Sequence, residues 1–180
     1  MKLKELIARL STNRQEDFPF PDNLEEYLED FIPNTLLKSE TLQKAFGVLN
    51  YEMEEIYKEA YDQYQDDCYL ESATHFRWLV LLNPFVSKYW NGLAASLQLL
   101  AKHEKALHAY AMVALLEKDN PYPHFRAYEC YEKMGNPEEG AKALELAYQR
   151  AKSEEKHREL QTEIEQLRSY LCLSHASNPL

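Results

Sequence analysis

A repeat of fixed period constrains the fold of this chain more than any other feature. Three similar segments, YLESATHFRWLVLLNP, HEKALHAYAMVALLEK and PEEGAKALELAYQRAK, begin at equal intervals, at Tyr69, His103 and Pro137. One aligned position always carries a small residue; its members are Ser72, Ala106 and Gly140. A repeat with a period of about 34 residues that reads as helix, turn and helix predicts stacked helix pairs.

Capping residues and prolines at the predicted helix starts support the helical interpretation. Asn50 is a predicted N-cap for the first helix, and Pro121 and Pro137 stand at predicted helix starts, where the missing amide hydrogen costs nothing. Helix pairs with this period are typical of tetratricopeptide repeats. We therefore predict an all-α tetratricopeptide-repeat solenoid of three helix pairs, with N-terminal helices and a C-terminal capping helix.

The capping helix is predicted from the segment where the period is lost. After Ser153 an apolar stripe of Leu160, Ile164, Leu167 and Leu171 runs along a strongly charged helix, which suits a last repeat that meets water on one side. The predicted division is an N-terminal helical and acidic arm at 1–47, repeats at 48–151 (about 53–86, 87–120 and 121–151), the capping helix at 152–171 and a tail at 172–180.

The N-terminal arm follows no repeat. Residues 2–10 predict a short amphipathic helix, which is marginal alone and is expected to dock on its own chain or on a second copy. The prolines of FPFPD at 18–22 break any helix there. From 15 to 37 the chain has acidic residues and no Lys or Arg, so we interpret this stretch as a solvated acidic arm rather than a site for a basic partner.

Composition excludes several classes of function. The net charge of −10 disfavours nucleic acid, and no run of about 18 apolar residues predicts stable membrane insertion. A secretory leader is not recognisable, and three separate cysteines suit reduced thiols in a cytosol. No spacing of His, Cys or acidic residues predicts a metal site, and no nucleophile or phosphate-binding motif predicts catalysis or a cofactor.

The aligned positions separate a predicted core from a predicted binding surface. Bulky residues such as Phe76, Trp90 and Tyr110 are assigned to the core. The first helix of each pair is expected to line a concave groove, where Tyr57, Tyr61 and Tyr64 recur at helical spacing. The residues predicted to line this groove from the pattern are Tyr57, Tyr61, Tyr64, Asn91, Ala95, Gln98, Tyr122, Phe125 and Glu129. The alternative is that the tyrosines only pack against the N-terminal segment or the next repeat.

Three motifs go beyond a generic repeat. They are the run IYxxAYxxYxxxxY from Ile56 to Tyr69, the GLAA turn from Gly92 to Ala95, and DNPYPHFRAYECYEKMGN from Asp119 to Asn136. Over about residues 48–151 the chain resembles the class II chaperones of bacterial type III secretion, the SycD/LcrH/IpgC group. It departs from that family at Asp67 and Ala101, which replace a turn glycine, and at Ser72, which replaces an alanine.

The resemblance implies a chaperone in the bacterial cytoplasm that holds hydrophobic translocator proteins before export. The groove would take an extended N-terminal segment of a translocator, and Tyr69 joins Tyr57, Tyr61 and Tyr64 on the family's aromatic positions. It also implies a homodimer through the N-terminal helices, although an intramolecular dock fits the sequence equally well. The alternative function is a general scaffold that binds a short peptide motif, for example a C-terminal carboxylate. That role normally needs a cation on the inner wall, where the sequence indicates Asn91, Gln98 and Glu129.

Overall fold

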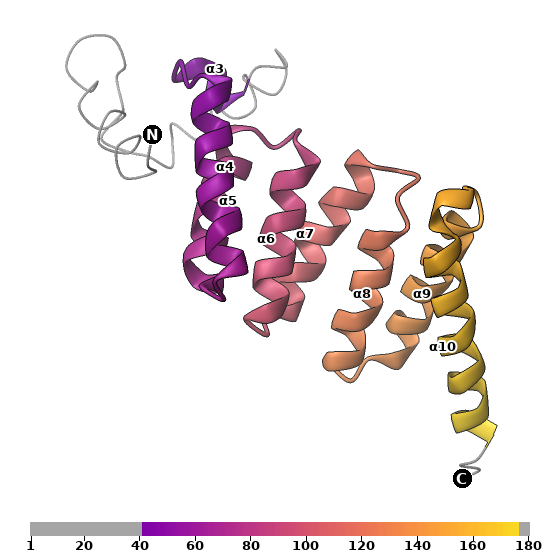
Figure 1. The fold of residues 1–180 in the computed structure, drawn as a ribbon. Coiled ribbons are helices and arrows are strands. Elements are labelled where there is room, and N and C mark those ends of the chain that lie inside the picture. Colours follow the sequence, from indigo (N-terminus) through magenta and orange to yellow (C-terminus); the bar gives the residue numbers. More distant parts are fainter. Residues whose placement is uncertain (1–40, 177–180) are drawn as a thin grey trace, which may run out of the picture. The chain divides into compact units, whose positions relative to one another are not determined.

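The computed structural model describes residues 41–176, with side chains through Ser169. The predictions for residues 1–40, and for the end of the tail at 177–180, lie outside the described residues. Every regular element of the described part is helical (Figure 1). The elements are α3 (Leu42–Ala45), α4 (Asn50–Gln65), α5 (Tyr69–Leu82), α6 (Ser87–Leu99), α7 (His103–Leu116), α8 (Tyr122–Lys133), α9 (Pro137–Ala151), the 3₁₀ helix η2 (Glu155–His157) and α10 (Arg158–Ala176). The predicted all-α class is confirmed, and none of these helices is long and apolar enough to cross a membrane.

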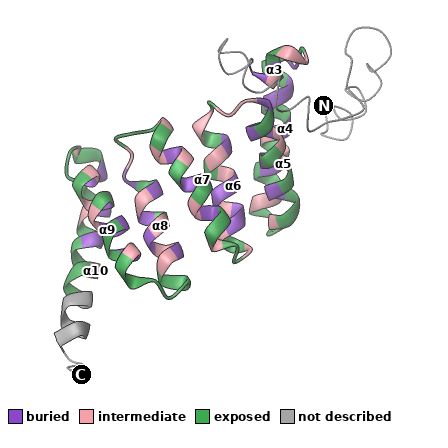
Figure 2. Ribbon diagram, turned by 180° about the vertical axis from the view of Figure 1, so that it is seen from behind, coloured by how far each residue is buried: buried purple, intermediate pink, exposed green. Residues whose placement is uncertain are grey.

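The described residues form two compact units. The first ends at Ser96 and the second begins at Leu97, so the boundary falls within α6. In the first unit α4 packs on α5; in the second α8 packs on both α7 and α9, and α9 packs on α10. Buried residues follow one stripe along each helix, as expected for amphipathic helices (Figure 2).

The core of the first unit is built around Phe76. Its side chain is 1% exposed and lies directly against Gly92 of α6, where any side chain would collide with the ring. The prediction that Trp90 belongs to this core is wrong in part: Trp90 is half-buried, and its indole N–H donates to the Pro84 carbonyl over 2.7 Å. Tyr89, only 3% exposed, is the buried aromatic residue, because it shares a face of α6 with Leu93 and the packing of α6 turns that face inward.

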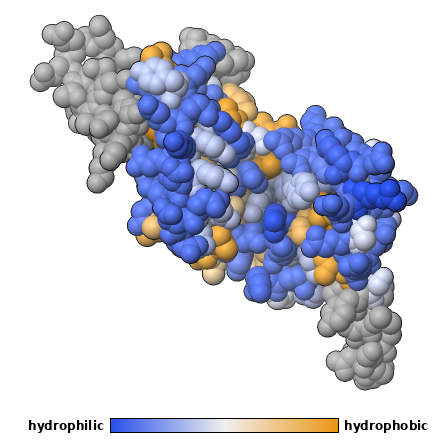
Figure 3. Space-filling view, viewed as in Figure 1, coloured by the Kyte–Doolittle hydropathy of each residue, from blue (hydrophilic) through white to orange (hydrophobic). Residues whose placement is uncertain are grey.

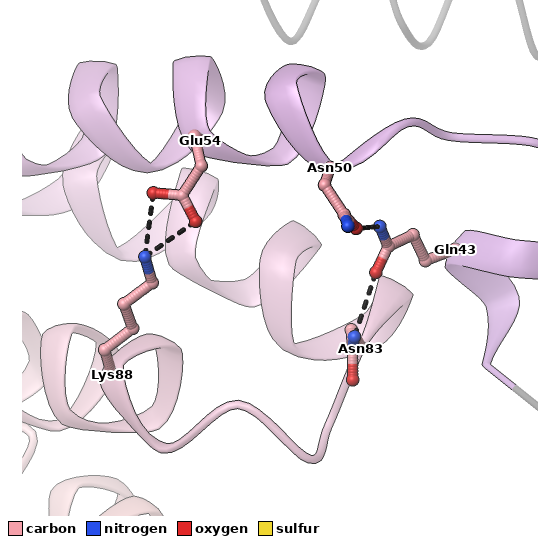
Figure 4. A network of polar contacts seen from close by, with 5 residues as sticks. All are labelled: Gln43, Asn50, Glu54, Asn83 and Lys88. Atoms are coloured by element: carbon pink, nitrogen blue, oxygen red, sulfur yellow. Dashed lines mark hydrogen bonds and ion pairs between the residues drawn. The ribbon is translucent and has the colours of Figure 1, made fainter. Parts of the chain in front are cut away.

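The start of α4 differs from the predicted N-cap. Leu49 is the cap residue, and its backbone N–H donates to the Glu52 carboxylate over 2.9 Å. Asn50 is instead the first helical residue, and its side-chain oxygen accepts from Gln43 Nε2 over 2.8 Å. Gln43 Oε1 in turn accepts from Asn83 Nδ2 over 2.9 Å (Figure 4). This amide chain connects α3 to the beginning of α4 and the end of α5.

The turns inside the three helix pairs adopt a left-handed backbone at the same aligned position. Asp67 has φ of 60°, Ala101 has 55° and Gly135 has 70°, and neighbouring members of this set are one repeat period apart. Only the third carries glycine, the residue that accepts this conformation without a steric penalty. The first two turns therefore keep the backbone geometry of the repeat at some cost in conformational strain.

Replacing Ala101 by glycine is expected to stabilise the protein by about 0.5–1 kcal/mol, because relief of the left-handed strain exceeds the added entropy of the unfolded chain. The side chain of Ala101 is exposed, so its removal loses little packing. The matched control is Lys102→Gly, where φ is −91° and glycine brings no relief. Urea denaturation of both variants checks this; equal or lower stability of Ala101→Gly would contradict the strain.

The core of the second unit lies between α8, α9 and α10. Leu160 and Ile164 of α10 are buried in it and Leu167 is partly buried, as the apolar stripe predicted. The helix differs from the predicted segment 152–171: a turn and η2 follow α9, α10 begins at Arg158, and it continues to Ala176, into the segment predicted as a tail. The extended backbone of Glu154, with φ of −136°, separates α9 from η2 and explains the later start.

Candidate functional site

The predicted tyrosine stripe forms a partly exposed aromatic surface on the first unit. Tyr57 and Tyr61 stack with their ring centroids 6.4 Å apart, and Tyr64 meets Tyr69 edge to face at 5.7 Å. Tyr61 is 48% exposed, whereas the other three rings are half-buried. Rings held by their neighbours lose little entropy when another chain covers them, so the stripe is suited to bind apolar side chains.

Tyr57 also connects this surface to the aromatic residues of the core. Its ring contacts Phe76 edge to face at 5.8 Å and lies 5.9 Å from the ring of Tyr89. Burial, with smaller contributions from Glu54 and Tyr57, raises the pKa of Tyr89 to about 12, so its hydroxyl remains protonated. Tyr57 therefore packs against a residue of the next repeat, and its half-buried ring remains part of the tyrosine stripe.

Lys88, which was not among the residues predicted from the sequence, also belongs to this surface. Lys88 Nζ lies 4.3 Å from the centre of the Tyr57 ring and forms an ion pair with Glu54 at 2.7 Å (Figure 4). Lys88 shares a face of α6 with Asn91, which is exposed, and Ala95, which is half-buried. No sequence spacing reveals a cation–π contact between two helices, since it depends on how α4 and α6 are rotated against each other.

The turn before α5 fixes the fourth tyrosine. The Tyr69 hydroxyl donates to the carboxylate of Asp67, the residue with the left-handed backbone. This hydrogen bond is the main reason that the pKa of Tyr69 is raised, with a smaller effect from desolvation. The departure from glycine at position 67 thus provides the acceptor that orients Tyr69 beside Tyr64.

The second unit presents a polar network instead of an aromatic stripe. Tyr110 Oη donates to Gln98 Oε1 over 2.7 Å, and Gln98 Nε2 donates to the Glu129 carboxylate over 3.0 Å. Arg126 Nη1 donates to the same carboxylate at 2.9 Å from each oxygen. Tyr122, 46% exposed, lies on the same face of α8 as Arg126 and Glu129. The predicted residues Gln98 and Glu129 therefore belong to one hydrogen-bonded network, and Tyr122 lies on the same face of α8.

Phe125 is a wrong prediction for the groove. Its side chain is 6% exposed and packs in the core of the second unit, with its ring centre 6.1 Å from that of Tyr128. The face of α8 that carries Phe125 and Tyr128 turns toward α9, so Phe125 is covered by the helix pair itself. Its neighbour Arg126 occupies the exposed face instead.

The helix faces that carry the predicted groove residues also carry cations that were not predicted from the sequence. Lys88 and Arg126 share faces with the predicted groove residues, but each is ion-paired, with Glu54 and Glu129 respectively. In the space-filling view hydrophilic residues cover most of the visible face, and hydrophobic residues form small separate patches (Figure 3). Within the described residues, no group of three or more His, Cys, Asp or Glu could hold a metal ion.

No family model matches the chain, but individual proteins do. A chain of the CopN–Scc3 complex is 44% identical over 92% of this chain and 98% of its own length, with a TM-score of 0.79. The Yersinia enterocolitica type III secretion chaperone SycD, solved in complex with a peptide of the translocator YopD, is 26% identical over 71% of this chain and 98% of its own, with a TM-score of 0.66. The low calcium response locus protein H of Yersinia pestis is 29% identical over 112 residues, which are 62% of this chain and 67% of that protein.

Proposed function

Because this chain belongs to the class II chaperones of type III secretion, we propose that it binds hydrophobic translocator proteins and keeps them soluble in the bacterial cytosol before export. The observation that carries the proposal is the surface of stacked tyrosines on α4, of which Tyr61 is 48% exposed. The similar chaperone SycD binds a peptide of a translocator, which supports a client of the same class here.

The proposed client segment is an extended N-terminal stretch of a translocator. Such proteins carry membrane-seeking segments that aggregate in water, and a prearranged surface masks them without requiring the client to fold. Tyrosine suits this task, because each ring offers a large apolar area and a hydroxyl for the client main chain. The acidic chain, with a net charge of −10, also favours solubility of the complex.

The alternative, a scaffold that clamps a C-terminal carboxylate, is less well supported. A clamp needs cations available to the ligand, and both cations on the predicted faces are already bonded to carboxylates: Lys88 to Glu54 and Arg126 to Glu129. The relative SycD is a secretion chaperone, and we propose that this chain likewise catalyses no reaction. The proposed homodimer involves the N-terminal helices, which lie outside the described residues.

Replacing Tyr61 and Tyr64 together by alanine is expected to weaken translocator binding at least about tenfold, because interface tyrosines commonly contribute more than about 1 kcal/mol each. The measurement is co-purification of a co-expressed translocator with the tagged chaperone. The melting curve of the double variant should remain close to that of the parent, since neither side chain is fully buried.

Tyr51→Ala is the matched control. Tyr51 is on the same helix and 61% exposed, but it lies away from the face of Tyr57 and Tyr61. This variant should retain the translocator. Undiminished binding by the Tyr61/Tyr64 variant would rule out the tyrosine surface as the client site, and equal loss in Tyr51→Ala would point to a nonspecific hydrophobic contact.

A further inference from the structure

The second unit contains a cavity that the proposed client surface does not use. It has a volume of about 330 Å³ and lies between α7, α8 and α9. Tyr131 of α8 lines it, roughly opposite Glu129 around the helix axis at about 100° of turn per residue. On α8 the cavity therefore lies on the other side from Arg126 and Glu129, while Tyr110 of α7, which donates to Gln98, also lines it.

The cavity is lined mainly by apolar groups. Alanines from three helices, Ala111 of α7, Ala127 of α8 and Ala143 of α9, leave room that larger side chains would fill. Leu146 also lines the cavity and is 46% exposed, so the cavity is accessible from solvent. The volume is at the lower end of the range of about 300–1,000 Å³ found for ligand pockets, so it suits one aromatic ring rather than a whole helix.

His124 adds a polar group to this apolar lining, and one of its ring nitrogens has no hydrogen-bond partner. The side chain lines the cavity, and its Nε2 is buried without a hydrogen-bond partner. Burial, assisted by the positive charge of Arg150, lowers the pKa of His124 to about 4, so the ring is neutral near pH 7. A neutral imidazole carries one donor and one acceptor nitrogen, so a ligand that reaches this ring can form a hydrogen bond with it.

The aligned residue of the preceding repeat, Trp90, shows why space remains beside His124. Trp90 precedes His124 by one repeat period, has a larger ring, and donates its indole N–H to the Pro84 carbonyl over 2.7 Å. The carbonyl aligned with that of Pro84 belongs to Lys118, and it accepts from Arg150 Nε over 2.8 Å. The His124 ring is therefore too small to fill the volume that the Trp90 indole occupies in the preceding repeat. The carbonyl aligned with the indole's acceptor is already bonded to Arg150.

We propose that this cavity binds the side chain of a tyrosine presented by a partner protein. The phenol ring matches the apolar lining and the size, and its hydroxyl can donate or accept, so it suits the neutral imidazole of His124 in either tautomer. Tyrosine is also among the residues that most often anchor protein interfaces. The partner reaches α8 on a different side from Arg126 and Glu129.

The test uses the full chain and two probes of matched shape, p-cresol and toluene, followed by protein-observed NMR. We expect p-cresol to shift the signals of Ala111, Ala127 and Leu146, and to bind about fivefold more tightly than toluene, the gain from one neutral hydrogen bond. His124→Phe keeps a ring of similar shape and should abolish the preference. Ala127→Leu should fill the cavity and remove binding of both probes.

Three results would overturn the proposal: no shifts with p-cresol, equal affinity for toluene, or a preference that survives in His124→Phe. N-acetyl-tyrosinamide distinguishes a side chain on a peptide from a free phenol. It should bind at least as well as p-cresol, and its exclusion would indicate a small-molecule site. Ala127→Leu should still retain the translocator, so this test and that of the tyrosine surface can fail independently.

Discussion

Replacing Gly92 by alanine is expected to destabilise the first unit by about 2–3 kcal/mol, the upper part of the usual range for overpacking a core. A Cβ atom at this position would lie 2.2, 2.3 and 2.6 Å from three atoms of the Phe76 ring. The ring is 1% exposed and cannot move into solvent, so α5 and α6 must separate or Phe76 must adopt a strained rotamer. Better helix propensity returns only about 1 kcal/mol. Urea denaturation followed by helical circular dichroism measures the difference.

Gly140→Ala provides the control for the effect of the added methyl group itself. There the nearest atom is the flexible end of Glu132 at 3.2 Å, and the next is Tyr131 Cβ at 3.5 Å. We expect this variant to be as stable as the parent or slightly more so. The double variant Gly92→Ala with Phe76→Leu should be less destabilised than the sum of its single variants. Parent-like stability of Gly92→Ala would show that α6 does not approach Phe76 this closely.

Replacing Ile164 by alanine is expected to cost about 3 kcal/mol in the second unit, by the usual loss for a buried large-to-small substitution. Ile164 is 0% exposed and belongs to the same buried cluster as Leu144 and Ala147 of α9, so its loss leaves a cavity beneath α10. The experiment is urea denaturation of the full chain. It measures how much of the unit's stability depends on the C-terminal helix that covers it.

The adjacent residue supplies the control for this second substitution. Glu163 is exposed on the same turn of α10, and Glu163→Ala should change stability by no more than about 0.5 kcal/mol. If Ile164→Ala were equally mild, α10 would not be an integral part of the core, and the role of a capping helix would have to be abandoned.

The repeat period predicted most of the helices to within a few residues, because it arises from local preferences. The repeat predicted at about 87–120 contains α6 and α7, and the repeat predicted at about 121–151 contains α8 and α9. Small residues at aligned positions predicted close packing for the same reason: Ser72, Ala106 and Gly140 are all buried. The N-cap at Asn50 was wrong by one residue, since Glu52 binds the Leu49 amide instead.

The predicted groove residues separate into groups according to how each helix is rotated. Tyr57 and Tyr61 could be selected from spacing alone, because one face of one helix carries both. Phe125 could not, since its spacing does not reveal that α9 and α10 cover that face. Lys88 and Arg126 were not predicted. In the structure their contacts with Tyr57 and Glu129 place them beside predicted groove residues.

By itself, the sequence determined the all-α class, the helix pairs and their period, and the family resemblance. These follow from local sequence preferences: the helical period of apolar residues, the positions of proline and glycine, and motifs along the chain. Only the tertiary structure decided that Tyr89 rather than Trp90 is buried, that Phe125 belongs to the core, and that His124 lines a cavity. The physical reason is that burial depends on the rotation and distance of neighbouring helices, which side chains from distant segments fix together.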